Sequence, residues 1–373
     1  MPEAGDPMSD LVLIVGAGIA GLSLSIALAQ RGVRSEIVER SPDWRSDGAG
    51  LFTCANGLAA LDRLGVGPAV RERGVPIRQR RIETARGRSV MVVDERDIWG
   101  GDRDSLGISR SALQDALRER LRDPPIHFGT TVDSLGTTPD RVEVVRSDGD
   151  ERVYTAVVGA DGHRSSVRQM VLGAPVPRLV EPRAARWLSR RPAGPDVWTL
   201  RADRDGMFLM IPVSEDEVYC YATRRERALE LDTDEWLEPF GAFADPVPDV
   251  LASRVTEVFE DRVEEIPIPD VWGDGRVMLI GDAAHAMAPF MAQGGSLALE
   301  DAEAAAAIIA EGDLDEAALR LTTARAARTE WVQARNRRRE KLSELPFTVA
   351  KLGLRVAGRR SWIADLAPLA PND

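Results

Sequence analysis

Three glycines at a fixed spacing lie early in the chain, in the segment Gly16-Ala-Gly18-Ile-Ala-Gly21. Backbone that lacks side chains lets a phosphate group approach closely, and a helix that begins there offers unpaired N–H groups to it. Glu39 follows about twenty residues later, where a carboxylate can accept hydrogen bonds from ribose hydroxyls. The pattern predicts a dinucleotide site but does not choose between FAD and NAD. Its expected residues are Gly16, Gly18, Ile19, Ala20, Gly21, Glu39 and Arg40.

The elements around these glycines have the order of a nucleotide-binding unit. An apolar run at 11–15 is typical of a buried parallel strand, residues 20–31 have helical periodicity, and 35–39 forms a second strand. Strand, helix and strand make a βαβ unit of about 30 residues. Further strands are expected at 141–146, 151–158, 197–201, 206–213, 217–223 and 276–281, and further helices at 109–121, 296–309 and 317–342.

A second polar segment follows an apolar run far downstream, at Gly281-Asp282-Ala-Ala-His285. Asp282 comes directly after an expected strand, so its carboxylate emerges where open α/β sheets bind ligands and can accept bonds from hydroxyls. An ordinary helix cap is the structural alternative for this aspartate. Gly294 and Gly295 then begin a helix whose positive end would stabilise a developing negative charge.

Together with Asp161-Gly162 in the middle of the chain, these segments resemble three motifs of the single-component FAD-dependent aromatic monooxygenases, the p-hydroxybenzoate hydroxylase-like flavoproteins. The resemblance implies FAD bound non-covalently, with Asp282 at its ribityl chain and the Asp161 segment at FAD and nicotinamide. Two positions differ from the family pattern, because Ala292 replaces a glycine and Ser296 an asparagine. The further cofactor residues implied are Arg45, Arg110, Asp161, Gly162, Gly281, Asp282, Pro289, Gln293, Gly294, Gly295 and Ser296.

The resemblance also implies a reaction. A member of this family takes a hydride from NADH or NADPH, reacts with O2 to give a flavin C4a-hydroperoxide, and hydroxylates an aromatic or heteroaromatic small molecule. A reductase, a dehydrogenase or a halogenase of the same fold is the alternative, since fold does not determine function. A flavin-binding regulator without turnover is a further alternative.

The expected fold class is α/β, with a Rossmann-like FAD-binding domain, an inserted antiparallel β-sheet substrate domain and C-terminal helices. The texture of the sequence changes near residue 172 to short strands separated by charged turns, and parallel-strand character returns near residue 269. We therefore expect the FAD-binding domain at 9–171 and 269–342, the substrate domain at 172–268, and a helical tail at 343–373.

The substrate side gives a weaker signal. One strand, 206–213, is apolar on both faces, and Tyr219 and Tyr221 share a face of the next strand. Expected substrate contacts are Phe208, Met210, Tyr219, Tyr221 and Phe290, although such residues also form ordinary cores. Candidate catalytic residues are Pro289, His285, Tyr219 and Tyr221, with orientation of the Asp282 loop as the alternative role of His285.

Composition restricts the class of protein. The 373 residues include 48 basic and 60 acidic side chains, a net charge of −12, which argues against nucleic-acid binding. The two cysteines form no CxxC pattern, no metal motif occurs, and no run reaches about 18 apolar residues. We expect a cytoplasmic monomer or homodimer whose partners are a small aromatic substrate and O2. The basic helix at 317–342 is interpreted as a solvated face or a set of ion pairs.

Overall fold

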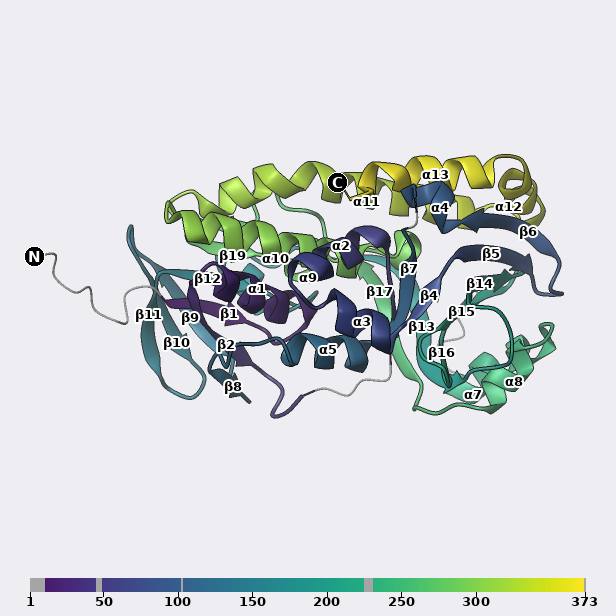
Figure 1. The fold of residues 1–373 in the computed structure, drawn as a ribbon, viewed down its shortest axis with the longest axis horizontal. Coiled ribbons are helices and arrows are strands. Elements are labelled where there is room, and N and C mark those ends of the chain that lie inside the picture. The colour runs from purple at the N-terminus through teal and green to yellow at the C-terminus, as the bar shows by residue number, and fades with distance from the viewer. Residues whose placement is uncertain (1–10, 45–48, 102, 225–230, 372–373) are drawn as a thin grey trace, which may run out of the picture.

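The computed structural model describes residues 11–44, 49–101, 103–224 and 231–371, so the predicted cofactor residue Arg45 lies outside the described residues. Figure 1 shows an elongated molecule with a parallel sheet toward the N-terminal end and a larger sheet at the opposite end. Long C-terminal helices lie along one side of both parts (Figure 1). No helix in the described ranges is long and apolar enough to cross a membrane.

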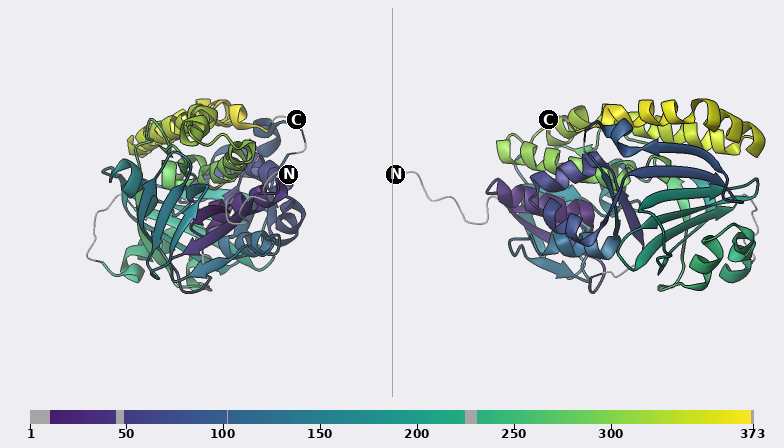
Figure 2. Two further views of the ribbon diagram at one scale, coloured as in Figure 1. Left: turned by 90° about the vertical axis from the view of Figure 1, so that its left-hand side faces the viewer. Right: turned by 45° about the vertical axis from the view of Figure 1, so that its right-hand side comes forward.

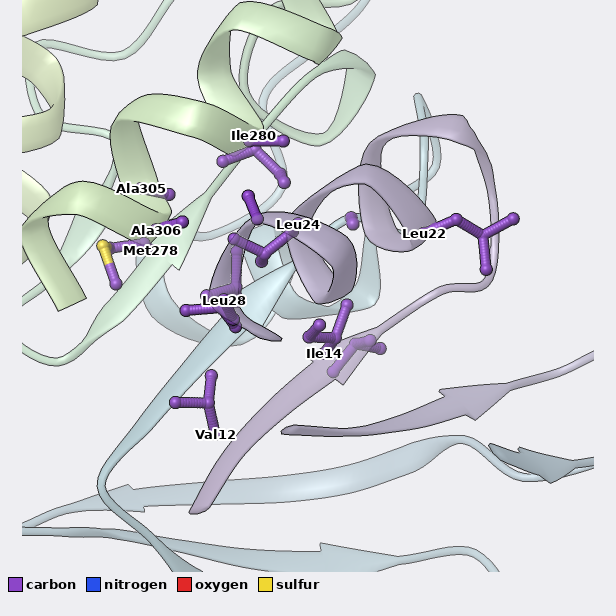
Figure 3. Close-up of a cluster of buried hydrophobic side chains, with 14 of the residues drawn as sticks. Val12, Ile14, Leu22, Leu24, Leu28, Met278, Ile280, Ala305 and Ala306 are labelled. Atoms are coloured by element: carbon purple, nitrogen blue, oxygen red, sulfur yellow. The ribbon is translucent and has the colours of Figure 1, made fainter. Parts of the chain in front are cut away.

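A six-stranded sheet forms the first part, with β18 (Gly273–Asp274) antiparallel at one edge. The other five strands are parallel, in the order β19 (Val277–Leu279), β12 (Ala156–Gly159), β1 (Leu11–Val15), β2 (Arg34–Glu39) and β8 (Ile126–Phe128). Helices α1 (Ile19–Gln30) and α10 (Gly294–Glu311) pack against each other beside it. Alanines on α10 face leucines on α1 in this core, as Figure 3 shows, so the two helices approach closely.

The predicted strand 151–158 is wrong in one respect, because the structure divides it into β11 (Glu151–Tyr154) and β12. The first piece belongs to an antiparallel sheet with β9 (Val132–Thr137) and β10 (Val142–Arg146), and the second to the parallel sheet. The chain changes layer at Thr155, where the N–H donates to the Leu11 carbonyl. Apolar side chains of both sheets pack in one core, so the hydrophobic pattern of 151–158 does not indicate that the strand is divided.

A seven-stranded sheet forms the second part. Its order is β17 (Phe259–Glu265), β13 (Arg178–Arg190), β16 (Glu217–Arg224), β15 (Gly206–Pro212), β14 (Val197–Ala202), β5 (Gln79–Thr84) and β6 (Ser89–Asp94). All neighbours are antiparallel except β14 and β5. The sheet therefore includes a hairpin from residues 79–94, outside the predicted insertion at 172–268. Two arginines in β5 interrupt the apolar alternation that would have indicated a strand.

Smaller elements connect the two parts, and Figure 2 shows the C-terminal helices spanning both. The remaining strands are β3 (Gly50–Thr53), β4 (Val75–Ile77) and β7 (Ser105–Ser109). The remaining α-helices are α2 (Ala55–Arg63), α3 (Gly67–Arg73), α4 (Glu95–Trp99), α5 (Arg110–Arg118), α6 (Ser166–Leu172), α7 (Thr233–Leu237), α8 (Val247–Ala252), α9 (Asp282–His285), α11 (Ala317–Glu344), α12 (Phe347–Gly353) and α13 (Arg359–Leu366). Short 3₁₀-helices are η1 (Glu238–Ala242), η2 (Pro289–Met291) and η4 (Ala367–Leu369), and η3 (Leu354–Gly358) is a π-helix.

Candidate FAD and substrate site

The glycine loop between β1 and α1 is packed too closely for side chains at two of its glycines. A Cβ on Gly21 would lie 1.9 Å from the Gly16 carbonyl oxygen, and one on Gly16 would lie 2.6 Å from the Ala160 carbonyl oxygen. Gly16 also has a φ of +109°, which disfavours other residues. Nothing lies within 4 Å of the Cβ direction of Gly18, so that face of the loop is open to a pyrophosphate.

Glu39 ends β2 beside this loop. Its Oε2 accepts a hydrogen bond of 2.8 Å from the Ala17 N–H, and its Oε1 accepts one of 2.9 Å from the Ser41 N–H. The carboxylate thus fixes the loop and keeps lone pairs for ribose hydroxyls. Arg40 follows as an exposed side chain, and Arg110 is exposed at the first position of α5. Gln114 of α5 donates to the Ala17 carbonyl, which brings that helix to the same loop.

Asp161 and Gly162 follow β12, at the same edge of the sheet. Oδ2 of Asp161 accepts hydrogen bonds from the backbone N–H groups of Ser166 and Val167, at 2.7 and 3.2 Å, and so caps α6. Its Oδ1 is buried and has no hydrogen-bond partner in the described structure. A buried acceptor of this kind is costly unless a ligand or a water satisfies it.

Arg168 connects the Asp161 segment to the Asp282 segment. It donates to the Ala283 carbonyl at 2.7 Å and to the His163 carbonyl at 2.6 Å, and its side chain is almost fully buried. Burial lowers the pKa of this guanidinium, while Asp161 and Asp282 raise it. Arg168 follows the Asp161-Gly162 pair in the sequence. Its contact with Ala283, 115 positions away, is not indicated by any local sequence pattern.

Asp301 organises the turn that presents Asp282. Its Oδ2 accepts from the Gly281 N–H at 3.0 Å and lies 2.6 Å from His285 Nε2, while Arg325 Nε donates to Oδ1 at 2.7 Å. Burial alone would raise the pKa of Asp301, but His285 and Arg325 lower it to about 2. Asp282 itself is exposed at the start of α9.

His285 is fully buried against Asp301 and the Trp272 ring, whose centroid is 5.0 Å away. Its side chain faces the interior, and from these contacts we propose orientation of the loop, the alternative interpretation, as its role. Asp301 and Arg325 were missed as site residues. The available sequence signal for Asp301 was an aspartate on the helix that follows the Asp282 loop.

Several polar atoms without hydrogen-bond partners lie where α2 meets the start of α10. Asn56 Nδ2 donates to Gln293 Oε1 at 3.0 Å, yet Asn56 Oδ1, Gln293 Nε2 and Ser296 Oγ are buried without partners in the described structure. Each such atom costs about 1–3 kcal/mol if left unsatisfied. Gly294 and Gly295, which have no side chains, lie between Gln293 and Ser296. A polar ligand edge fits this place, as the flavin pyrimidine would.

Ala292 precedes this loop in a left-handed conformation, with a φ of +53°. The backbone therefore keeps the shape that a glycine would favour, at a cost of about 1–2 kcal/mol for alanine. The C-terminal helices hold the neighbouring residues: the Met291 N–H donates to Asn336 Oδ1 at 2.8 Å, and Arg339 donates to the Phe290 carbonyl at 3.0 Å. Pro289 is exposed at the start of this turn.

Arg339 belongs to the expected ion pairs of the basic helix, because its guanidinium lies 3.4 Å from the Asp365 carboxylate. Burial lowers the pKa of its guanidinium to about 10, although Asp365 raises it. Other basic residues of α11 form the expected ion pairs, such as Arg328 with Glu300 and Arg337 with Glu265. The helix therefore supports the Phe290 loop as well as presenting charge.

Tyr219 and Tyr221 lie on the face of β16 that is turned toward the FAD-binding part. They share a buried cluster with Phe52 and Met291, and Phe290 packs against it. A Cβ on Gly50 would lie 2.3 Å from the Tyr219 Cβ, so β3 and β16 touch. The structure therefore brings both tyrosines and Phe290 to one buried cluster.

Phe208 and Met210 lie on the opposite face of the same sheet. β15 pairs Phe208 with Ala222 and Met210 with Cys220, one residue out of phase with the tyrosines. Both pack with Trp187 and Phe240 beneath α7 and α8. We expected these two residues to contact substrate, but they do not lie on the face that carries the tyrosines. Met207, Leu209 and Ile211 lie on that face.

FAD fits this site. The open face at Gly18, the Glu39 carboxylate and the unpartnered buried atoms of Asp161, Gln293 and Ser296 are all on the elements that the three motifs occupy. When bound, FAD supplies the redox chemistry. The protein's residues would hold and orient it.

Comparison with known proteins also indicates an FAD-binding protein. A family described as FAD binding domain matches residues 10–338. The aurachin C monooxygenase/isomerase of Stigmatella aurantiaca is 33% identical over 333 residues, covering 85% of each chain. The 2-heptyl-3-hydroxy-4(1H)-quinolone synthase of Pseudomonas aeruginosa is 32% identical over 380 residues, 97% of this chain and 94% of the relative.

The fold agrees as well. The structure of Klebsiella pneumoniae HpxO complexed with FAD and uric acid has a TM-score of 0.83 at 24% identity, covering 95% of this chain and 97% of that one. A salicylate hydroxylase substrate complex has a TM-score of 0.78 at 22% identity, covering 99% of both chains. The chain therefore belongs to the FAD binding domain family and is a flavin-dependent monooxygenase.

Proposed function

We propose that this monooxygenase hydroxylates a neutral heteroaromatic ring of the 4-quinolone type that bears an apolar chain, with NADH or NADPH as electron donor. The observation that carries the proposal is the apolar tyrosine-side face of the seven-stranded sheet, formed by Met207, Leu209 and Ile211 around Tyr219 and Tyr221. The relative at 32% identity is named for a 4(1H)-quinolone that bears a heptyl chain, which supports this ring class.

The two tyrosines are suited to a neutral ring oxygen. Burial raises the pKa of Tyr219 to about 12, against a smaller lowering by Arg186, and burial also raises the pKa of Tyr221. Both hydroxyls stay protonated at neutral pH and can donate a hydrogen bond to a carbonyl oxygen. Apolar walls around them exclude water from the reacting ring and orient it.

We assign FAD to the loops already described. Gly16, Gly18, Ile19, Ala20 and Gly21 would hold the pyrophosphate. Glu39, with Arg40 and Arg110 nearby, would bind the adenosine end, and Asp161, Gly162, Gly281 and Asp282 the ribityl chain. The flavin ring would meet Pro289, Gln293, Gly294, Gly295 and Ser296.

A second candidate is hydroxylation of an aromatic acid. Arg186 of β13 is paired with Tyr221 of β16, with its guanidinium carbon 5.6 Å from that ring centroid, and it forms no ion pair in the described ranges. A half-buried cation on this face would bind a carboxylate. The 3-hydroxybenzoate 6-hydroxylase 1 of Aquipseudomonas alcaligenes is 30% identical over 370 residues, 88% of each chain.

The test compares substrates and one pair of variants. Oxidation of NADH and NADPH by the flavin-loaded protein is measured with 4-quinolones of increasing chain length and with hydroxybenzoates, and products are weighed by mass spectrometry. We expect quinolones with long chains to be oxygenated, with little change in Arg186→Met. The matched control is Arg190→Met, an exposed arginine of the same strand. Turnover of acids alone, lost in Arg186→Met and kept in Arg190→Met, would establish the second candidate instead.

A further inference from the structure

The chain carries an exposed apolar stripe near its C-terminus, which we define as Leu342, Leu345, Val349, Leu352 and Val356. Their exposed fractions are 44%, 37%, 53%, 63% and 77%. Val349, Leu352 and Val356 are spaced i, i+3 and i+7, which places them on one face of the helical segment made by α12 and η3. Large apolar side chains gathered on a surface mark an interaction site more often than scattered ones do.

Basic residues flank the stripe. Lys341, Arg355 and Arg360 are exposed and form no ion pair among residues 11–44, 49–101, 103–224 and 231–371. Lys351, between two stripe residues, lies over the Phe347 ring at 5.8 Å. Between residues 341 and 360 there are five basic side chains and one acidic side chain, Glu344, in a chain whose net charge is −12. The segment therefore combines an apolar face with a local positive charge.

The segment is anchored on its other side, so the stripe is held outward. Trp362 of α13 packs edge-on against Trp198, with ring centroids 5.6 Å apart. Arg359 pairs with Asp97 at 2.7 Å, and Gly358 is buried against Met91. Figure 2 shows this helical end of the molecule opposite the N-terminal end that carries β1 and β2. A surface bound there would leave the glycine loop uncovered.

We propose that this stripe docks the enzyme on the surface of an anionic membrane. An amphipathic basic helix lies in such an interface with its apolar side chains among the acyl chains and its cations at the headgroups. Pairing of the stripe with a second copy is disfavoured, because a two-fold interface places the same patch on both subunits and would bring these like charges together.

Vesicle flotation tests the docking with the flavin-loaded enzyme. One set of vesicles is phosphatidylcholine alone, and the other contains phosphatidylglycerol as well. We expect flotation with the anionic set, weakened by added salt. The triple variant Val349→Ser, Leu352→Ser, Val356→Ser should lower the bound fraction at least about tenfold, and Arg355→Glu with Arg360→Glu should lower it to a similar extent.

The matched control replaces three apolar residues with similar exposure elsewhere, Val153→Ser, Val176→Ser and Leu179→Ser, and should float like the wild type. Flavin content and thermal unfolding confirm that each variant is folded. Absence of flotation with the anionic vesicles, or equal flotation of the stripe variants, would overturn the proposal. A concentration-dependent dimer in sedimentation that the stripe variants abolish, without flotation, would identify a second copy as the partner.

Discussion

The FAD loops and the tyrosine face of the seven-stranded sheet are held by different forces. Around Gly16, Asp161 and Asp301, each position is fixed by backbone packing or by charged hydrogen bonds at 2.6 to 3.2 Å. Tyr219 and Tyr221 pack among apolar side chains of a buried cluster, and the Arg186 guanidinium carbon lies 5.6 Å from the Tyr221 ring centroid. The first region tolerates little change, whereas the second can be reshaped for another ring. Variants should therefore separate cofactor binding from substrate recognition.

The largest effect is expected from Gly21→Ala. The new Cβ would lie 1.9 Å from the Gly16 carbonyl oxygen, so the glycine loop must open or the start of α1 must shift. We expect the purified variant to lose nearly all bound FAD, measured as visible flavin absorbance per protein. Gly241→Ala is the matched control, because nothing lies within 4 Å of its Cβ direction. Full flavin content in Gly21→Ala would refute the close packing of this loop.

The second largest effect is expected from Asp301→Ala. It leaves His285 and Arg325 buried without their shared carboxylate, and breaking a buried ion pair in this way costs about 3–5 kcal/mol. Denaturant unfolding measures the loss, and FAD content should fall with it. Asp313→Ala, at an exposed position, should change the free energy of unfolding by less than about 0.5 kcal/mol. Similar losses in the two variants would contradict the role of Asp301.

The same carboxyl group predicts an acid dependence. The pKa of Asp301 is lowered from 3.8 to about 2 in the folded protein. Its contribution to the free energy of unfolding is therefore present above about pH 4 and is lost as pH falls toward 2. The free energy of unfolding should therefore fall with acid less steeply in Asp301→Asn than in the wild type. Parallel curves for the two proteins would show that Asp301 titrates normally.

The smallest effect is expected from Tyr219→Phe. Removing one hydroxyl that donates to a ring oxygen should lower kcat/KM about fivefold, since a hydrogen bond of this kind contributes about 1 kcal/mol. FAD content and stability should stay unchanged, in contrast to the loop variants. Loss of FAD in this variant would remove the distinction between the two regions.

Because burial raises the pKa of Tyr219 to about 12, no inflection from this tyrosine should appear in the wild-type rate between pH 6 and about 9.

The two regions also differ in how well sequence predicts them. The glycine loop, Glu39, Asp161 and Asp282 follow their strands directly, so strand ends and short spacing were enough to bring them to one edge of a sheet. Contacts between distant segments were not visible: Arg168 to Ala283, Asn336 to Met291 and Arg339 to Phe290 depend on tertiary packing.

On the substrate side, the pattern of β15 showed two apolar faces but not which one meets the tyrosines. That choice depends on the register with β16, which places Leu209 opposite Tyr221 and sends Phe208 beneath the helices. The hairpin of β5 and β6 was missed for a related reason, because Arg80 is buried in the sheet by its ion pair with Glu95. A buried charge hides the alternation that marks a strand.

The most direct test of the central claim uses isotopically labelled dioxygen with the flavin-loaded protein, NADH or NADPH, and a long-chain 4-quinolone. The account predicts that the ring product gains one labelled oxygen atom, with nicotinamide oxidation accelerated by the quinolone. Oxidation of nicotinamide to give only peroxide, or a product oxygen that comes from water, would contradict it.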